Sequence, residues 1–387
     1  MAALGNQPPA RVTVNEFTTI ATVWTHNQFI DGTTIAGSPL ALRIAAGNVP
    51  NFVDLATGGY GTAIQDGLNS SQTPTMANFA TLANLLAGCT TRVTADACAK
   101  LFAAATSPTG AVPADTLAVA EAIARNPAHQ ADQLFALLNA FYPVPQGKKM
   151  RATPFTPYLS FAPSAWVLPL KFVGGGVSGG GKLMFDSQGN VWHADRFGSS
   201  ERGRLKLVEL MAAYAAEGEE AATESLVNHL SAQKPGYWDG GSVTVLRPDG
   251  SKAPFSPVSG QGLGGPWVVA VDGNDNIWVS NFTSAMAGNL VQLCGVRTET
   301  SPQGTKTGDA ISPPGGYVGG GMQQLVDVGV GPAGDVWLTN NWEIDAAGLG
   351  KASEALSTRG AGQGVVVFFG VAKPVTTPLI GPPRPAP

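Results

Sequence analysis

The sequence is poor in charged residues. Only 13% of its 387 residues are Asp, Glu, Lys or Arg, about half the share that is usual in soluble domains. The formal net charge is −4, so the chain lacks the basic excess with which nucleic-acid-binding proteins neutralise phosphates, and we exclude a nucleic-acid partner. Intrinsic disorder is excluded as well, because 44% of the residues are hydrophobic and the net charge is low.

Long apolar runs and common catalytic motifs are also missing. The sequence has no run of about 18 uncharged apolar residues, which predicts that no segment spans a membrane. Residues 1–17 carry no signal peptide, so we expect either a cytosolic protein or, as we favour, a mature secreted or cell-surface chain with an initiator Met. No Gly-x-Ser-x-Gly motif is present, and no Gly cluster is followed by Gly-Lys-Ser/Thr, so neither an α/β-hydrolase nor a phosphate-binding loop is indicated.

The chain has only three cysteines. Cys89 and Cys98 flank a polar loop between two helix-like stretches, where a disulfide would close a short loop. The alternative is a pair of buried thiols in a reducing cytosol, but the low charge and the many Ser, Thr, Asn and Gly residues favour the disulfide. Cys294 lies in a strand-like run, which predicts a small buried apolar side chain.

Residues 13–142 are predicted to be mostly helical. Apolar residues recur at helical spacing in four stretches, 76–89, 95–106, 115–126 and 128–142. Asp115 and Asn126 lie where helix ends are expected, and Pro127 is suited to begin the next helix. We therefore expect a helical N-terminal region over 1–142, followed by a Pro-rich linker or strap over 143–164.

Three segments of the second half repeat one pattern: 174–195, 260–281 and 319–340. In each copy a tryptophan follows an apolar residue at an offset of 15 positions: Val177 and Trp192, Leu263 and Trp278, and Met322 and Trp337. Each copy predicts a strand, a tight turn rich in Asn, Asp and Gly, and a returning strand. A third strand is expected at 241–246, 289–294 and 363–369. Such a unit cannot bury both faces alone, so neighbouring units must stack.

The repeated pattern D-x-x-G-N-[VI]-W-[VL]-x-N resembles secreted bacterial β-propellers of the NHL type and their streptogramin-lyase-like branch. The matching residues are Asp186, Gly189, Asn190, Trp192, Asp272, Asn276, Trp278, Asn281, Gly334, Asp335, Trp337 and Asn340. The resemblance implies export and a propeller, and it implies little about activity. Three copies are plain, whereas closed propellers have roughly four to eight blades, so the blade number stays open.

The expected fold class is therefore α+β, with a helical region followed by a Gly-rich antiparallel β-propeller. We place the propeller at 165–372, with a helical insertion at 204–233, and a Pro-rich tail at 373–387. An additional strand is expected at 165–172, where it could pair with 364–370.

One pair of residues suits acid–base chemistry. His193 replaces the Val279 and Leu338 of the other copies, and strand alternation places it on the same face as Asp195. The two could act as a base and the residue that orients it, or as metal ligands. The alternative is a hydrogen-bonded structural pair in a divergent copy.

Two further groups could bind ligands. Asn281, Asn340, Asn341 and Glu343 offer oxygen atoms suited to Ca²⁺ or Mg²⁺, although a polar turn would use the same residues. Trp238, Trp267 and Trp342 interrupt the repeat and could form an aromatic rim for a sugar or peptide, although packing in the core would also account for them.

The leading functional hypothesis is an extracellular binding or scaffolding module, because no complete catalytic set is evident. Its partner would be a small molecule, a glycan or a protein. One alternative is a metal-assisted lyase or lactone hydrolase with its site at the propeller mouth. Another is a self-assembling subunit that completes an open propeller against a second copy.

Overall fold

A computed structural model describes residues 1–5, 8–177, 180–196, 241–282, 289–317, 322, 325–340 and 364–375. The chain divides into two compact units, Met1–Phe172 and Val173–Pro387, which we call the helical unit and the sheet unit. The described residues contain eight α-helices and four antiparallel sheets, which confirms the mixed α and β class. The helical insertion expected at 204–233 and most of the tail lie outside the described residues.

The helical unit holds all eight of these helices and one short hairpin. The elements are α1 (Glu16–Thr25), β1 (Ile30–Asp31), β2 (Thr34–Ile35), α2 (Pro39–Phe52), α3 (Thr62–Gln65), α4 (Gly67–Ser70), α5 (Thr75–Thr90), α6 (Ala97–Ala104), α7 (Thr116–Arg125) and α8 (Ala131–Phe141). The four helices expected from periodicity are α5 to α8. The expected start at Pro127 is wrong, because residues 127–130 form a turn and Gln130 has a left-handed backbone.

Local sequence accounts for the ends of several helices. The Asn15 side chain accepts a hydrogen bond from the backbone of Thr18, whose hydroxyl accepts one from the backbone of Asn15, so α1 begins with a capping box. Asp115 caps α7 as expected. Helix α5 is buried on nearly all sides, because α1, α6, α7 and α8 all contact it.

The expected disulfide joins Cys89, near the end of α5, to Cys98 in α6. A disulfide of this kind indicates that the protein resides in an oxidising environment. Cys294, in the sheet unit, is a free and buried cysteine, as its apolar surroundings in the sequence predict.

The residues that follow the Pro-rich stretch belong to the helical unit. Trp166 is fully buried there, and the residues after it run in an extended conformation. Side chains of the helices hold this backbone, because Asn78 donates to Val167 O at 2.8 Å and Thr75 donates to Pro169 O at 2.7 Å. The strand expected at 165–172 is therefore wrong. The stretch at 364–370, its expected partner, instead pairs with another strand of the sheet unit.

The sheet unit contains three repeat sheets, one for each copy of the sequence pattern. The first is β3 (Gly180–Phe185), β4 (Val191–Asp195), β5 (Ser242–Leu246) and β6 (Val258–Ser259); the second is β7 (Pro266–Val271), β8 (Ile277–Asn281) and β9 (Leu290–Leu293); the third is β10 (Leu325–Val330), β11 (Val336–Asn340) and β12 (Gly364–Phe368). A short 3₁₀ helix, η1, spans Thr298–Thr300.

The same strand register recurs in all three repeat sheets. The first residue of the opening strand pairs with the last residue of the middle strand: Gly180 with Asp195, Pro266 with Asn281, and Leu325 with Asn340. A shift in strand register follows each of these pairs. The third strands expected from the sequence are present as β5, β9 and β12, so the three-strand repeat is confirmed.

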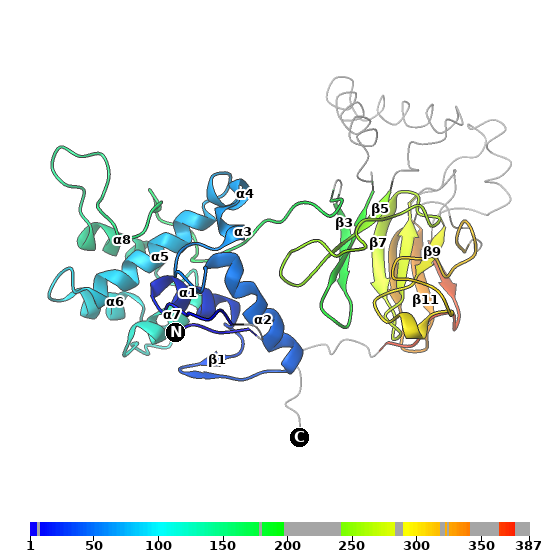
Figure 1. Cartoon of the computed structure of the whole chain (residues 1–387), viewed down its shortest axis with the longest axis horizontal. Helices are drawn as coiled ribbons and strands as arrows, with labels where there is room; N and C mark the ends of the chain where they lie inside the picture. The colour runs from blue at the N-terminus through cyan, green and yellow to red at the C-terminus, as the bar shows by residue number, and fades with distance from the viewer. Residues whose placement is uncertain are drawn as a thin grey trace. The chain divides into compact units, whose positions relative to one another are not determined.

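The repeat sheets stack in chain order, with the second between the other two (Figure 1). One apolar core lies between the first and second sheets and includes Trp192 and Val279. Another lies between the second and third sheets and includes Trp278 and Leu338. Of the helices that the structure describes, none combines the length and the apolar character that crossing a bilayer requires.

Candidate functional site

The Asp and Trp residues of the repeated motif form turns that are closed by hydrogen bonds. The Asp186 carboxylate accepts hydrogen bonds from Trp192 Nε1 at 2.9 Å and from Asn190 Nδ2 at 2.9 Å. Asp272 accepts one from Trp278 Nε1 at 3.0 Å. All five side chains are buried. The motif therefore orients a core tryptophan, and in these two copies it has a structural role.

The third copy departs from this arrangement. Gly331 stands where the other copies have Asp186 and Asp272, so the third copy lacks the carboxylate that accepts the indole hydrogen bond in the other two. Trp337 is also 48% exposed, whereas Trp192 and Trp278 are 0% exposed. The repeated tryptophan therefore packs in the core in the first two copies only.

The structure brings His193 and Asp195 together on one face of β4. His193 Nδ1 lies 3.4 Å from Asp195 Oδ2, but without hydrogen-bond geometry. Asp195 is 0% exposed, and its carboxylate accepts a 2.6 Å hydrogen bond from Thr244 Oγ1. On the other side of the ring, His193 Nε2 faces Gly180, where a Cβ atom would lie only 3.2 Å away. The imidazole is thus enclosed by its own sheet.

The oxygen ligands expected for a metal lie on different sheets. Asn281 ends β8 and Asn340 ends β11, so they occupy equivalent places in the second and third repeat sheets. The buried Asn281 amide oxygen accepts a hydrogen bond from Gly264 N at 3.0 Å. Asn341 and Glu343 lie outside the described residues. Within the described ranges, no cluster of three His, Cys, Asp or Glu residues is arranged to bind a metal ion.

Of the three tryptophans expected to form a rim, the structure describes Trp267, while Trp238 and Trp342 lie outside the described residues. Trp267 stacks on Phe282 with ring centroids 4.6 Å apart. The guanidinium carbon of Arg196 lies 3.3 Å from the centroid of the Trp267 ring. Burial lowers the pKa of Arg196. The cluster joins the first and second repeat sheets by a cation–π contact, a role that nothing in the sequence around Arg196 predicted.

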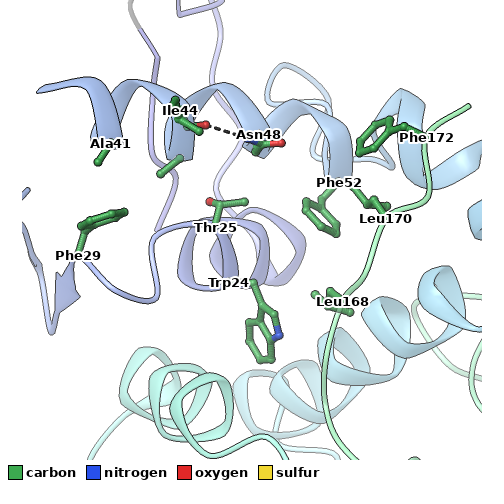
Figure 2. A pocket seen from close by; sticks show the side chains of 11 residues that line it. Trp24, Thr25, Phe29, Ala41, Ile44, Asn48, Phe52, Leu168, Leu170 and Phe172 are labelled. Atoms are coloured by element: carbon green, nitrogen blue, oxygen red, sulfur yellow. Dashed lines mark hydrogen bonds between the residues drawn. The ribbon is translucent and has the colours of Figure 1, made fainter. Parts of the chain in front are cut away.

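The helical unit contains a cavity of about 520 Å³ (Figure 2). It lies between α1, α2 and the extended residues that end the unit. Its lining consists of Trp24, Thr25, Phe29, Ala41, Ile44, Ala45, Asn48, Phe52, Leu168, Leu170 and Phe172. Cavities of this size accommodate small organic ligands.

Each wall of the cavity has a local explanation. Side chains of the extended segment alternate, so Leu168, Leu170 and Phe172 turn towards the helices while the residues between them are exposed. Trp24 is fixed by a hydrogen bond from its Nε1 to Trp166 O at 3.1 Å. Phe52 ends α2 and is buried. The cavity walls are thus positioned by backbone and core contacts before any ligand binds.

The cavity lining carries no charged side chain. Its two polar side chains already make hydrogen bonds within the protein: Asn48 Nδ2 donates to Ile44 O at 2.9 Å, and Thr25 Oγ1 donates to Ala21 O at 2.8 Å. An apolar, uncharged lining of this kind favours apolar ligands, because it offers a charged group no partner.

Sequence reasoning did not find this cavity. The alternating apolar residues at 166–172 gave a signal, but we assigned it to a strand of the sheet region. The other walls come from α1 and α2, whose mutual packing cannot be deduced from spacing. Comparisons of the chain with protein-family models, with curated proteins and with solved structures give no match.

Proposed function

We propose that this protein is a non-catalytic binding module whose helical unit binds an uncharged, mainly apolar small molecule. The observation that carries the proposal is the preformed cavity of about 520 Å³ with its apolar lining. Aromatic rings and aliphatic side chains line it, and its polar groups are few and already bonded, as is usual for sites that recognise ligands by shape and apolar contact.

In this proposal the sheet unit is a segment of β-propeller that acts as a scaffold. The recurring register and the stacking of the three repeat sheets support it. A further support is the ion pair between Lys182 Nζ of β3 and Asp327 Oδ2 of β10, which are 2.7 Å apart. Side chains from the first and third sheets meet past β7, so the opening strands converge on one side, as the inner strands of propeller blades do.

We place the protein outside the cytoplasm. The Cys89–Cys98 disulfide supports this location, because such bonds are rare in reducing compartments.

The enzyme hypothesis has weaker support. A general base needs access to its substrate, but Asp195 is buried against Thr244 and the His193 side chain is only 15% exposed. The burial of Asp195 and its hydrogen bond from Thr244 suit a structural role instead. We therefore favour binding over a lyase or lactone-hydrolase activity.

Titration with the neutral fluorophore N-phenyl-1-naphthylamine tests the cavity. We expect saturable binding by the wild-type chain and, for Ala41→Glu, at least about a tenfold loss of affinity, since the variant places a charge against the ligand. Ala46→Glu is the matched control, because Ala46 lies on the same helix but does not line the cavity. Absence of saturable binding, or equal affinity in the two variants, would contradict the proposal.

A further inference from the structure

Each repeat sheet has two chemically distinct faces. One face carries the repeated tryptophan, and we call it the tryptophan face. The other carries the residues on either side of that tryptophan in the middle strand, and we call it the opposite face. In the second sheet, strand pairing places Trp278 beside Ala270 on the first face, and Val279 beside Val269 on the second.

The two stacking layers inside the chain use the same pair of faces. Trp192 of the first sheet packs in one core with Val269 and Val279 of the second. Trp278 of the second sheet packs in the next core with Val328 and Leu338 of the third. A tryptophan face therefore binds the opposite face of the following sheet, and the chain contains this contact twice.

The stack leaves one face of each kind partly open at its ends. On the opposite face of the first sheet the exposed part is the β3 edge, because Asp195 of β4 and Thr244 of β5 are buried and Gly175 lies against Thr244. On the tryptophan face of the third sheet, Trp337 is 48% exposed and Val365 is 62% exposed. On the opposite face of the first sheet, Leu183 is 52% exposed and Phe185 is 59% exposed. The residues equivalent to Leu183 are Val269 and Val328, which are both buried. Among the described residues, no other sheet covers either end face.

We propose that a second copy of this chain covers both end faces. The tryptophan face of the third sheet in each copy binds the opposite face of the first sheet in the other copy. These are the two surfaces that already bind each other twice within one chain. Neither the cavity nor its ligand enters this argument, so failure of one proposal leaves the other intact.

The geometry favours a closed dimer over an open chain of copies. The described residues of two copies supply six repeat sheets, within the range of roughly four to eight blades found in closed propellers. The convergence of β3 and β10 at the Lys182–Asp327 ion pair shows that the stack curves towards the opening strands. A head-to-tail contact that curves can close into a ring, whereas one that does not would produce filaments.

Light scattering on purified full-length protein, over a range of concentrations, tests the dimer. We expect twice the mass of one chain for the wild type. Trp337→Glu and Phe185→Lys each place a charge in the proposed contact, and each should weaken dimerisation by about 30-fold or more, as substitution of a central aromatic residue does in other interfaces.

Mixing the two variants tests whether the contact joins unlike faces. In both inner layers, the residue at the position of Phe185, which is Val271 or Val330, lies in the same core as the preceding tryptophan. A heterodimer of the Trp337→Glu and Phe185→Lys variants would therefore have one wild-type contact and one contact in which the introduced glutamate meets the introduced lysine. We expect the mixture to form a heterodimer that is more stable than the homodimer of either variant.

Two variants of exposed residues in the helical unit are matched controls. Phe161→Glu and Met150→Lys introduce the same charges at residues that are 70% and 67% exposed, and both should leave the dimer intact. Circular dichroism on every variant confirms folding. A wild-type chain that stays monomeric overturns the proposal and assigns the faces to another segment or protein. A dimer that survives Phe185→Lys overturns the head-to-tail contact.

Discussion

The two units of this protein bury their apolar residues in different ways. The helical unit surrounds one core, in which α5 is enclosed by other helices and further closed by a disulfide. The sheet unit has two thin cores, each lying between neighbouring repeat sheets. A single enclosed core has room for a ligand only where its side chains pack imperfectly, and in the helical unit the cavity is such a place. A stack exposes an apolar face at each end, wherever the repetition stops.

The difference teaches that equivalent residues in a repeat need not have equivalent roles. Trp278 and Trp337 share a motif position and a strand register, but within the described part of the chain only Trp278 has a neighbouring sheet to cover it. Position within the stack therefore decides whether a motif tryptophan stabilises the fold or is available to a partner.

Truncation of these two tryptophans should give the largest effect. Trp278→Ala removes a fully buried ring, so we expect the sheet unit to lose about 3–5 kcal/mol of unfolding free energy. Trp337→Ala, measured under conditions where the chain is monomeric, should change it by less than about 1 kcal/mol. Denaturant-dependent hydrogen exchange, followed in peptides from each unit, measures both. Equal losses would show that Trp337 has a buried contact within its own chain.

Removal of the disulfide should affect the helical unit alone. The bond joins residues that are nine apart, and closure of a loop of about that length stabilises a fold by about 2–3 kcal/mol. The double variant Cys89→Ala/Cys98→Ala should therefore lower the stability of the helical unit by that amount while the sheet unit is unchanged. Exchange rates in peptides of α5 and α6 report the loss. The same measurement on Cys294→Ala, which alters the sheet unit instead, is the control, and a change in both units would refute their independence.

Restoring the missing carboxylate of the third copy should raise the unfolding free energy, by less than removal of Trp278 or of the disulfide lowers it. A Cβ atom at Gly331 would lie 3.7 Å from Trp337 Nε1 and within ordinary contact distance of its neighbours. Gly331→Asp should therefore recreate the hydrogen bond that Asp272 makes to Trp278 and stabilise the third sheet by about 1 kcal/mol. Thermal unfolding tests this. Gly331→Ala is the control for the loss of backbone freedom, and an equal gain in both variants would exclude the hydrogen bond.

Much of the fold could be predicted from the sequence, because local patterns specify it. Helical spacing identified α5 to α8, and the fixed distance to each tryptophan identified the three repeat sheets. The exposure of Trp337 could not be predicted, because it depends on what lies beside the third sheet rather than on the motif. The same limit applies to Asp195, whose carboxylate accepts a hydrogen bond from Thr244, a residue 49 positions away along the chain.

The smallest predicted effect is a pH dependence confined to the helical unit. Burial lowers the pKa of His26, the residue that caps the C-terminal end of α1 and whose Nδ1 atom lies 3.0 Å from Thr22 O. The unfolded chain therefore binds a proton at His26 more readily than the folded chain does, and the stability of the helical unit should fall as the pH drops below about 6.5, the ordinary value for histidine. Hydrogen exchange between pH 7.5 and pH 5 should show faster opening of α1 without a matching change in the repeat sheets. The dependence should disappear in His26→Gln and persist in His129→Gln. Persistence in both variants would assign the pH effect to another group.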